Sequence, residues 1–177
     1  TNRKVKDKAE VFTPSWICNA QNNLVDSAWF GRTNVFNKER NQSWVVNSKR
    51  IEFPTKKTWQ DYVLANRMEV SCGEAPYLVS RYDTITGKPI LLKRRIGFLT
   101  ENCALFQKYE NVEDWYKWAV FAFKSVYGFE WQGDNLLLAR ENLLYSFCDY
   151  YKAKFGGSPL WQQILEIANI ILWNIWQ

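Results

Sequence analysis

Apolar residues recur along the chain with two spacings, one typical of helices and the other of short strands. Helical spacing predicts helices at 14–28, 58–66, 111–126, 134–155 and from Ser158 onward, with a further helix resuming at Pro76. Short apolar runs predict strands at 68–71 and 127–131, and residues 173–177 either end the last helix or form a third strand.

Polar and glycine-containing segments separate these elements. Residues 31–58 are expected to be irregular, although Trp44–Val46 could pair as a short strand, and residues 84–97 are expected to form a hairpin or a loop. Thr13 and Asp134 are expected to cap the helices that follow them. The alternation of helices and strands predicts an α/β fold with a mostly parallel sheet flanked by helices.

The bulk composition indicates one folded domain. A chain of 177 residues with 47% hydrophobic and 23% charged residues is long enough for one core and too apolar for a disordered protein. The apolar runs are too short to span a bilayer, and the start of the sequence has no secretory pattern. The four cysteines are widely spaced, which is typical of reduced thiols. We therefore expect a cytoplasmic protein with no membrane partner.

The chain contains no histidine, and this excludes several kinds of catalytic site. Without it, Ser-His-Asp and Cys-His mechanisms are excluded, and a zinc site is not expected. The net charge of +5 suits a polyanionic partner. The 30 aromatic residues (10 Trp, 9 Tyr, 11 Phe) fill a core or stack on bases, and the helical spacing of most of them favours the core.

Two turns at expected strand ends have a composition suited to a ligand. The segment 69–78 combines small residues with the start of a helix, so a ligand could approach its backbone closely. The segment 127–131 places Glu130 at a strand end, where a carboxylate can accept both hydroxyls of a ribose. These features by themselves indicate a nucleoside-type ligand.

Three segments resemble, in order, the motifs of adenine-specific DNA methyltransferases. Glu69–Leu78 is similar to motif I, and Glu10–Pro14 is similar to motif X, which precedes motif I in one circular order of that family. Tyr127–Glu130, followed by 138–144, is similar to motif II and its helix. The group that the chain resembles most is the bacterial restriction-modification proteins called restriction endonuclease subunit M.

The resemblance implies a partial Rossmann-like fold that binds S-adenosylmethionine. Motif X would close over the cofactor, the motif I turn would surround its methionine end, and motif II would hold the ribose and stack on the adenine. The residues implied to bind the cofactor are Phe12, Thr13, Pro14, Glu69, Cys72, Gly73, Glu130 and Trp131.

Five of these residues also have a purely structural interpretation. Thr13 and Pro14 are a good helix start in any protein, and Cys72 is typical of a small buried residue. Glu69 could fix a local loop, and Glu130 could form a surface ion pair.

The sequence also departs from the family. It contains no Asn/Asp-Pro-Pro-Tyr/Phe loop, which in the family holds the flipped adenine, and no recognisable target-recognition domain. Residues 84–126 are expected to be an insertion in one incomplete domain that covers 1–177. No catalytic or metal-binding residues are therefore predicted. The chain is expected to be a fragment, a truncated product or half of a split enzyme.

Two classes of function follow. The leading hypothesis is the cofactor-binding portion of an S-adenosylmethionine-dependent DNA adenine methyltransferase, inactive alone, that acts on DNA once it is completed. Self-association or a second subunit would complete it, because an incomplete sheet leaves an open edge. The alternative is a non-enzymatic DNA-binding or assembly module that uses Lys93, Arg94 and Arg95. An unrelated α/β nucleotide-binding protein is a weaker third possibility.

Overall fold

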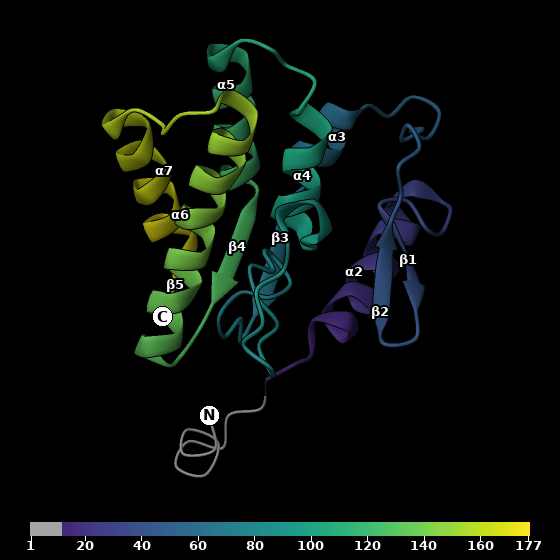
Figure 1. Ribbon diagram of the computed structural model, residues 1–177, viewed down its shortest axis with the longest axis horizontal. Coiled ribbons are helices and arrows are strands. Elements are labelled where there is room, and N and C mark those ends of the chain that lie inside the picture. The colour runs from purple at the N-terminus through teal and green to yellow at the C-terminus, as the bar shows by residue number, and fades with distance from the viewer. Residues whose placement is uncertain (1–11) are drawn as a thin grey trace.

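The computed structural model describes residues 12–177 and has an α/β architecture (Figure 1). A parallel sheet contains β3 (Arg67–Val70), β4 (Val126–Phe129) and β5 (Ile175–Trp176) in that order, and an antiparallel hairpin contains β1 (Asn37–Arg40) and β2 (Ser43–Val46). The helices are α2 (Ser15–Phe30), α3 (Trp59–Leu64), α4 (Phe98–Phe106), α5 (Val112–Lys124), α6 (Gly133–Phe155) and α7 (Trp161–Asn174), with a 3₁₀ turn η1 (Leu92–Arg94).

Two helices connect each pair of parallel strands. The chain passes from β3 through α4 and α5 to β4, and from β4 through α6 and α7 to β5. Glu69 pairs with Gly128, and Gly128 pairs with Ile175, so the three strands run in register. The predicted α/β class and parallel sheet are confirmed, including the third strand near the end of the sequence.

The main core lies between the sheet and helices α4 to α7. Trp115, Ala119 and Ala122 lie along one face of α5 and are fully buried there, as the helical spacing predicts. Trp118 is only partly buried and contacts the ring of Trp59 edge-on. Because α4 and α5 supply much of this core, residues 98–124 are integral to the domain. That 84–126 is an insertion relative to the family stays a prediction.

The opposite face of the sheet is apolar and largely open. Strand register places the side chains of Met68, Val70, Tyr127, Phe129 and Trp176 on this face. Met68 is 54% exposed and Val70 is 69% exposed, so the helices in the described part of the chain leave this side of β3 uncovered. A parallel sheet usually has both faces covered.

Several sequence expectations are wrong in detail. Thr13 does not cap the first helix: Pro14 is the N-cap residue and has no capping side chain, and Asp83 accepts a hydrogen bond from the Ser15 N–H instead. Asp134 lies in the first turn of α6, after the N-cap residue Gln132. No helix forms at Pro76, where the chain makes turns.

The turn at Pro76 has a packing role that explains why α4 begins where it does. The carbonyls of Tyr77 and Leu78 accept the N–H groups of Phe98 and Leu99, the first two residues of α4. This contact requires a very close approach, because a Cβ on Gly97 would lie 2.4 Å from the Leu78 oxygen. Gly97 also has φ +120°, a conformation that other residues rarely adopt.

A buried polar cluster joins α2, α3 and α4. The Tyr62 hydroxyl lies 2.6 Å from Asp26 Oδ1 and 3.0 Å from Glu101 Oε2, and all three side chains are buried. Tyr62 has one proton to donate, so both short contacts form only if one carboxyl is protonated. Burial raises the pKa of Asp26 from 3.8 to about 6. Burial and the Asp26 charge raise that of Glu101 well above its usual range.

Replacement of Gly97 by alanine should strongly destabilise the fold. The new methyl group would collide with the Leu78 carbonyl and force α4 away from the turn after β3, at a cost of about 2–4 kcal/mol. Gly157→Ala is the matched control, because a Cβ at Gly157 meets no atom within 4 Å. Urea unfolding of both variants measures the difference, and equal stabilities would contradict the predicted clash.

The Asp26–Tyr62–Glu101 cluster should make stability fall as pH rises. A carboxyl with a raised pKa in the folded state binds more protons folded than unfolded, so its contribution is complete below about pH 4 and lost through about pH 6. Asp26→Asn should therefore flatten the pH dependence of the unfolding free energy by up to about 3 kcal/mol. An unchanged slope, matching that of the exposed-site control Glu141→Gln, would show that Asp26 titrates normally.

Candidate functional site

The turn that follows β3 has an unusual backbone. Ser71, Gly73 and Ala75 have φ values of 55°, 54° and 60°, so every second residue adopts the left-handed conformation. Two of these residues are not glycine, and each such residue is strained by about 1 kcal/mol or more. This strain is held in place by hydrogen bonds from the turn to β4 and to Glu130.

Glu130 connects the turn after β3 to the turn after β4. Its Oε2 accepts a hydrogen bond from the Gly73 N–H at 2.6 Å, and its Oε1 accepts one from the Gln132 N–H at 2.8 Å. The side chain is 6% exposed, so the alternative of a surface ion pair is wrong. A carboxylate has about four acceptor sites, which leaves two for another donor.

Glu69 lies on the neighbouring strand β3, where it pairs with Gly128, and it is also buried. Its Oε1 accepts a long hydrogen bond of 3.4 Å from the Tyr77 N–H, and its Oε2 has no partner among the described residues. Burial, and to a smaller extent the Glu130 charge, raise the pKa of Glu69 well above its usual range. A protonated Glu69 can donate a hydrogen bond from the oxygen that has no partner.

Cys72 packs tightly between the two strands. Its N–H donates to the Phe129 carbonyl at 2.8 Å, and its side chain is buried against Gly128, where a Cβ would lie 3.1 Å from Cys72 Sγ. Burial raises the pKa of the Cys72 thiol to about 12. Cys72 is therefore a packing residue and not a nucleophile.

Of the segment that resembles motif X, Glu10 and Val11 lie outside the described residues, and 12–14 lie next to the loop that follows motif I. The Thr13 carbonyl accepts a hydrogen bond of 2.7 Å from Thr84 Oγ1, and Asn22 Nδ2 donates to the Tyr77 carbonyl at 2.9 Å. Phe12, Thr13 and Pro14 are half-buried. The structure thus brings 12–14 to the loop 77–84, which begins at the same turn as Gly73.

Trp131 is the most exposed of the candidate residues. Its side chain is 72% exposed, and its carbonyl accepts a hydrogen bond from Gln177 Nε2 at 3.0 Å. The exposed ring is free to stack on an adenine, but it does not pack against the turns after β3 and β4.

One residue that holds the turn had no assigned role in the sequence. Asn142 on α6 donates from Nδ2 to the Glu74 carbonyl at 3.0 Å and lies 3.1 Å from the Tyr82 hydroxyl, which donates to Glu74 Oε2. The sequence does carry a signal, since Asn142 precedes Leu143 and Leu144 on the inner side of a long helix. A buried amide at such a position needs partners.

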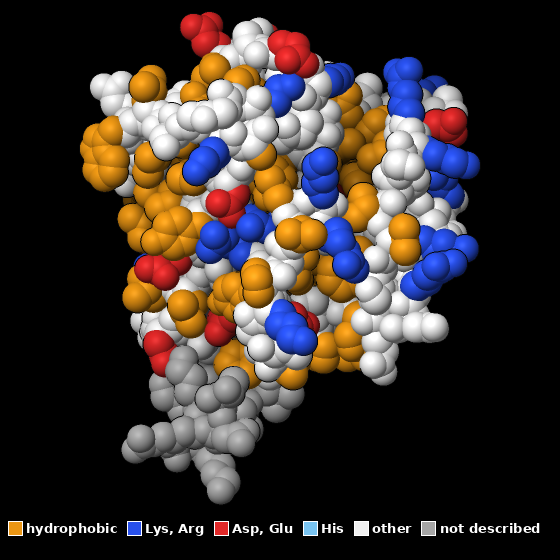
Figure 2. Space-filling view, in the orientation of Figure 1, with side chains coloured by type: hydrophobic (Ala, Val, Ile, Leu, Met, Phe, Trp, Pro, Cys, Tyr) orange, Lys and Arg blue, Asp and Glu red, His pale blue; other side chains and the backbone are white. Residues whose placement is uncertain are grey.

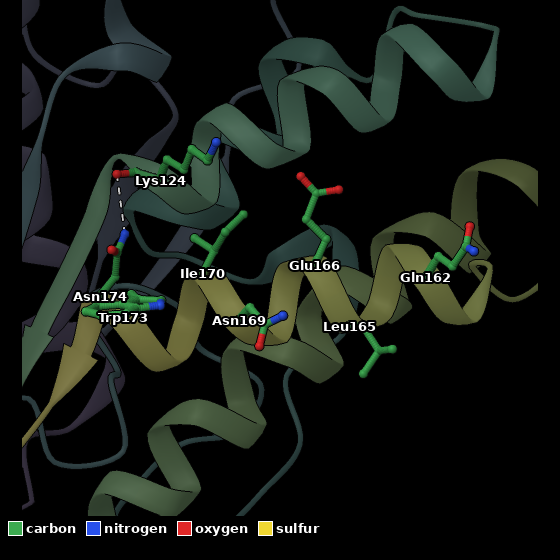
Figure 3. A pocket seen from close by; sticks show the side chains of 8 residues that line it. All are labelled: Lys124, Gln162, Leu165, Glu166, Asn169, Ile170, Trp173 and Asn174. Carbon is green, nitrogen blue, oxygen red and sulfur yellow. Dashed lines mark hydrogen bonds between the residues drawn. The ribbon is translucent and has the colours of Figure 1, made fainter.

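Open space lies next to the Gly73 backbone. A Cβ on Gly73 would meet no atom within 4 Å, so a ligand can approach this backbone. Three hollows in the structure lie elsewhere and are lined by none of the eight cofactor-site candidates. One of them, of about 530 Å³, lies along α7 near Lys124, where Asn174 turns toward the Lys124 carbonyl (Figure 3).

Comparisons with known proteins do not identify a family. No family model, no curated protein and no solved structure matches this chain. Among residues 12–177, no group of three or more acidic or cysteine side chains could hold a metal ion, and no helix is long and apolar enough to cross a membrane.

Proposed function

We propose that this chain is the cofactor-binding portion of an S-adenosylmethionine-dependent DNA adenine methyltransferase. The observation that carries the proposal is the Glu130 carboxylate, which lies at the end of β4 and accepts the Gly73 N–H from the turn after β3. In open α/β sheets, nucleoside cofactors commonly bind outside the carboxyl ends of the strands, against a glycine turn and a carboxylate. The resemblance of three segments to methyltransferase motifs is the reason for proposing S-adenosylmethionine as the cofactor.

The residues fit such a cofactor in part. Glu130 would accept the ribose hydroxyls with its two remaining acceptor sites, while the backbone at Gly73 offers open space for close approach. Glu69 would support the turn from within, because its Oε1 accepts the Tyr77 N–H and its Oε2 is closed to solvent. When bound, the cofactor supplies an activated methyl group, and this chain orients it.

Methyl transfer would require a further polypeptide segment or subunit. The sequence has no Asn/Asp-Pro-Pro-Tyr/Phe loop to hold an adenine amine. The open apolar face with Met68 and Val70 is also what a half-covered methyltransferase sheet would present. We therefore propose that the completed enzyme acts on DNA in restriction-modification.

S-Adenosylhomocysteine, the stable product form of the cofactor, should bind saturably to the chain in calorimetry. Glu130→Gln keeps the shape of the side chain but removes the charge that accepts the ribose hydroxyls, so the dissociation constant should rise at least about tenfold. Glu113→Gln on the exposed face of α5 should leave it unchanged.

Thermal unfolding of each variant shows whether it has folded. The cofactor proposal is overturned if the folded protein binds no S-adenosylhomocysteine, or if Glu130→Gln binds it as tightly as the parent.

A basic surface favours a second candidate, a DNA-binding module. Figure 2 shows blue side chains gathered over the side of the molecule that carries the hairpin β1–β2. A groove there is lined by the cations Arg40, Lys93 and Arg94, together with Asn41, Ser43, Trp44, Val45 and Val46. The Trp44 indole donates to the Arg94 carbonyl at 2.8 Å, which fixes η1 against the hairpin.

DNA binding by this surface should weaken with salt. Arg40→Gln together with Lys93→Gln would remove two exposed cations, so the slope of log affinity against log salt should fall by up to about 2 for duplex DNA. Lys117→Gln on α5 is the control. Fluorescence anisotropy in graded salt measures this slope, and an unchanged slope would exclude the groove as the DNA contact.

A further inference from the structure

Helix α7 is apolar on two sides. Its inner side carries Ile167 and Ile171, which are buried in the main core. A second row of apolar residues, spaced four, three and four positions apart, consists of Trp161, Leu165, Ala168 and Leu172. Leu165 of this row points away from α5 (Figure 3). A surface helix normally has one apolar stripe, so the second row indicates that another surface covers it.

The second row and its neighbours form a large exposed patch. Trp161 is 70% exposed and Trp173 is 84% exposed. The exposed apolar side chains of this region, called the α7 patch below, are Leu160, Trp161, Leu165, Leu172 and Trp173. Figure 2 shows hydrophobic side chains gathered on the side of the molecule that carries α7.

The size of the α7 patch is close to what a dimer needs. Its five side chains together expose roughly 700 Å², whereas the largest apolar patch on a typical monomer is about 300–600 Å². A stable interface buries about 800 Å² on each partner. The patch is therefore larger than a free surface normally is and nearly large enough to form one side of an interface.

The charge of α7 argues against a nucleic acid or an anionic membrane as the partner. The helix has no Lys or Arg, and Glu166 is its only charged residue. Glu166 already accepts a hydrogen bond from the Tyr116 hydroxyl at 2.7 Å. Lys124 is the one cation among the residues that line the hollow along α7. Nucleic acids and anionic lipids bind where several cations accompany the apolar residues, so the patch fits a protein partner.

The spacing of the second row indicates which protein surface fits it. Intervals of four, three and four residues are those of a coiled-coil seam, in which a helix packs against another helix with the same spacing. A second copy of this chain presents that same row. A two-fold axis would bring the two α7 patches together, as in most homodimers, and no pair of strong like charges would oppose the contact.

The outer edge of β5 is a poor alternative for self-association. A strand edge attracts a second chain through its unpaired N–H and C=O groups. The Ile175 N–H donates to the Ile171 carbonyl. The Ile175 carbonyl accepts hydrogen bonds of 3.0 and 2.8 Å from Nε and Nη2 of Arg140. Both backbone groups of Ile175 are therefore occupied, and the helix next to this strand offers the larger surface.

We propose that this chain forms a dimer through α7, with the α7 patch packed against the same patch of a second copy. The contact goes beyond the proposed cofactor function and does not depend on it. None of the eight cofactor-site candidates belongs to the patch.

Sedimentation velocity of the whole chain over a wide range of concentrations tests the proposal. The parent should change from monomer to dimer as the concentration rises. Leu165→Glu places a charge within the second row and should raise the dimer dissociation constant at least about tenfold. Leu24→Glu is the matched control and should leave the constant unchanged, because Leu24 is exposed on α2, outside the patch.

Further measurements separate the possible outcomes. Urea unfolding shows whether each variant has folded, and Glu130→Gln should dimerise like the parent, so failure of the cofactor site and failure of the dimer are distinct results. The proposal is wrong if the folded parent stays monomeric at every concentration, including a monomer that binds phosphatidylcholine vesicles through the patch. It is also wrong if Leu165→Glu dimerises as tightly as the parent, which strand addition at β5 would allow.

Discussion

The hydrogen bond from the Gly73 N–H to the Glu130 carboxylate, 2.6 Å long, joins the turn after β3 to the turn after β4. Its importance follows from the backbone of the turn, where Ser71 and Ala75 adopt strained left-handed conformations. Such strain persists only where neighbouring contacts fix it. Here a buried charge accepts backbone donors from both turns. The same contact positions Gly73, whose backbone is open to a ligand, next to Glu130, which can accept further hydrogen bonds.

Helices α2 and α4 are connected to that turn by hydrogen bonds. Its continuation, through Tyr77 and Leu78, accepts the first N–H groups of α4 across the close contact at Gly97. The same loop also contacts α2, because Asn22 donates a hydrogen bond to the Tyr77 carbonyl. The turns after β3 and β4 are therefore connected to the hairpin side of the molecule through α2 and α4.

The sequence predicted the long helices, because amphipathic segments such as α5 carry a clear helical period, but it did not predict α4. The prediction failed for segments whose conformation is set by tertiary contacts. The Pro76 segment has a good helix start, but its carbonyls cap α4 instead. Strand β1, which begins at Asn37, was not predicted because all its residues are polar or charged. The buried positions of Glu69 and Glu130 could be inferred from strand ends. The hydrogen bond to Gly73 could not, because it joins residues whose spacing along the sequence has no period.

The central claim is that the Glu130 carboxylate, bonded to Gly73, forms the wall of a nucleoside site. The Gly73 amide proton reports on it most directly in an NMR titration with S-adenosylhomocysteine. We predict a strongly downfield amide resonance that is protected from hydrogen exchange and shifts on addition of the ligand, with both properties lost in Glu130→Gln. A Gly73 amide that exchanges like that of an exposed loop and does not respond to the ligand would contradict the account.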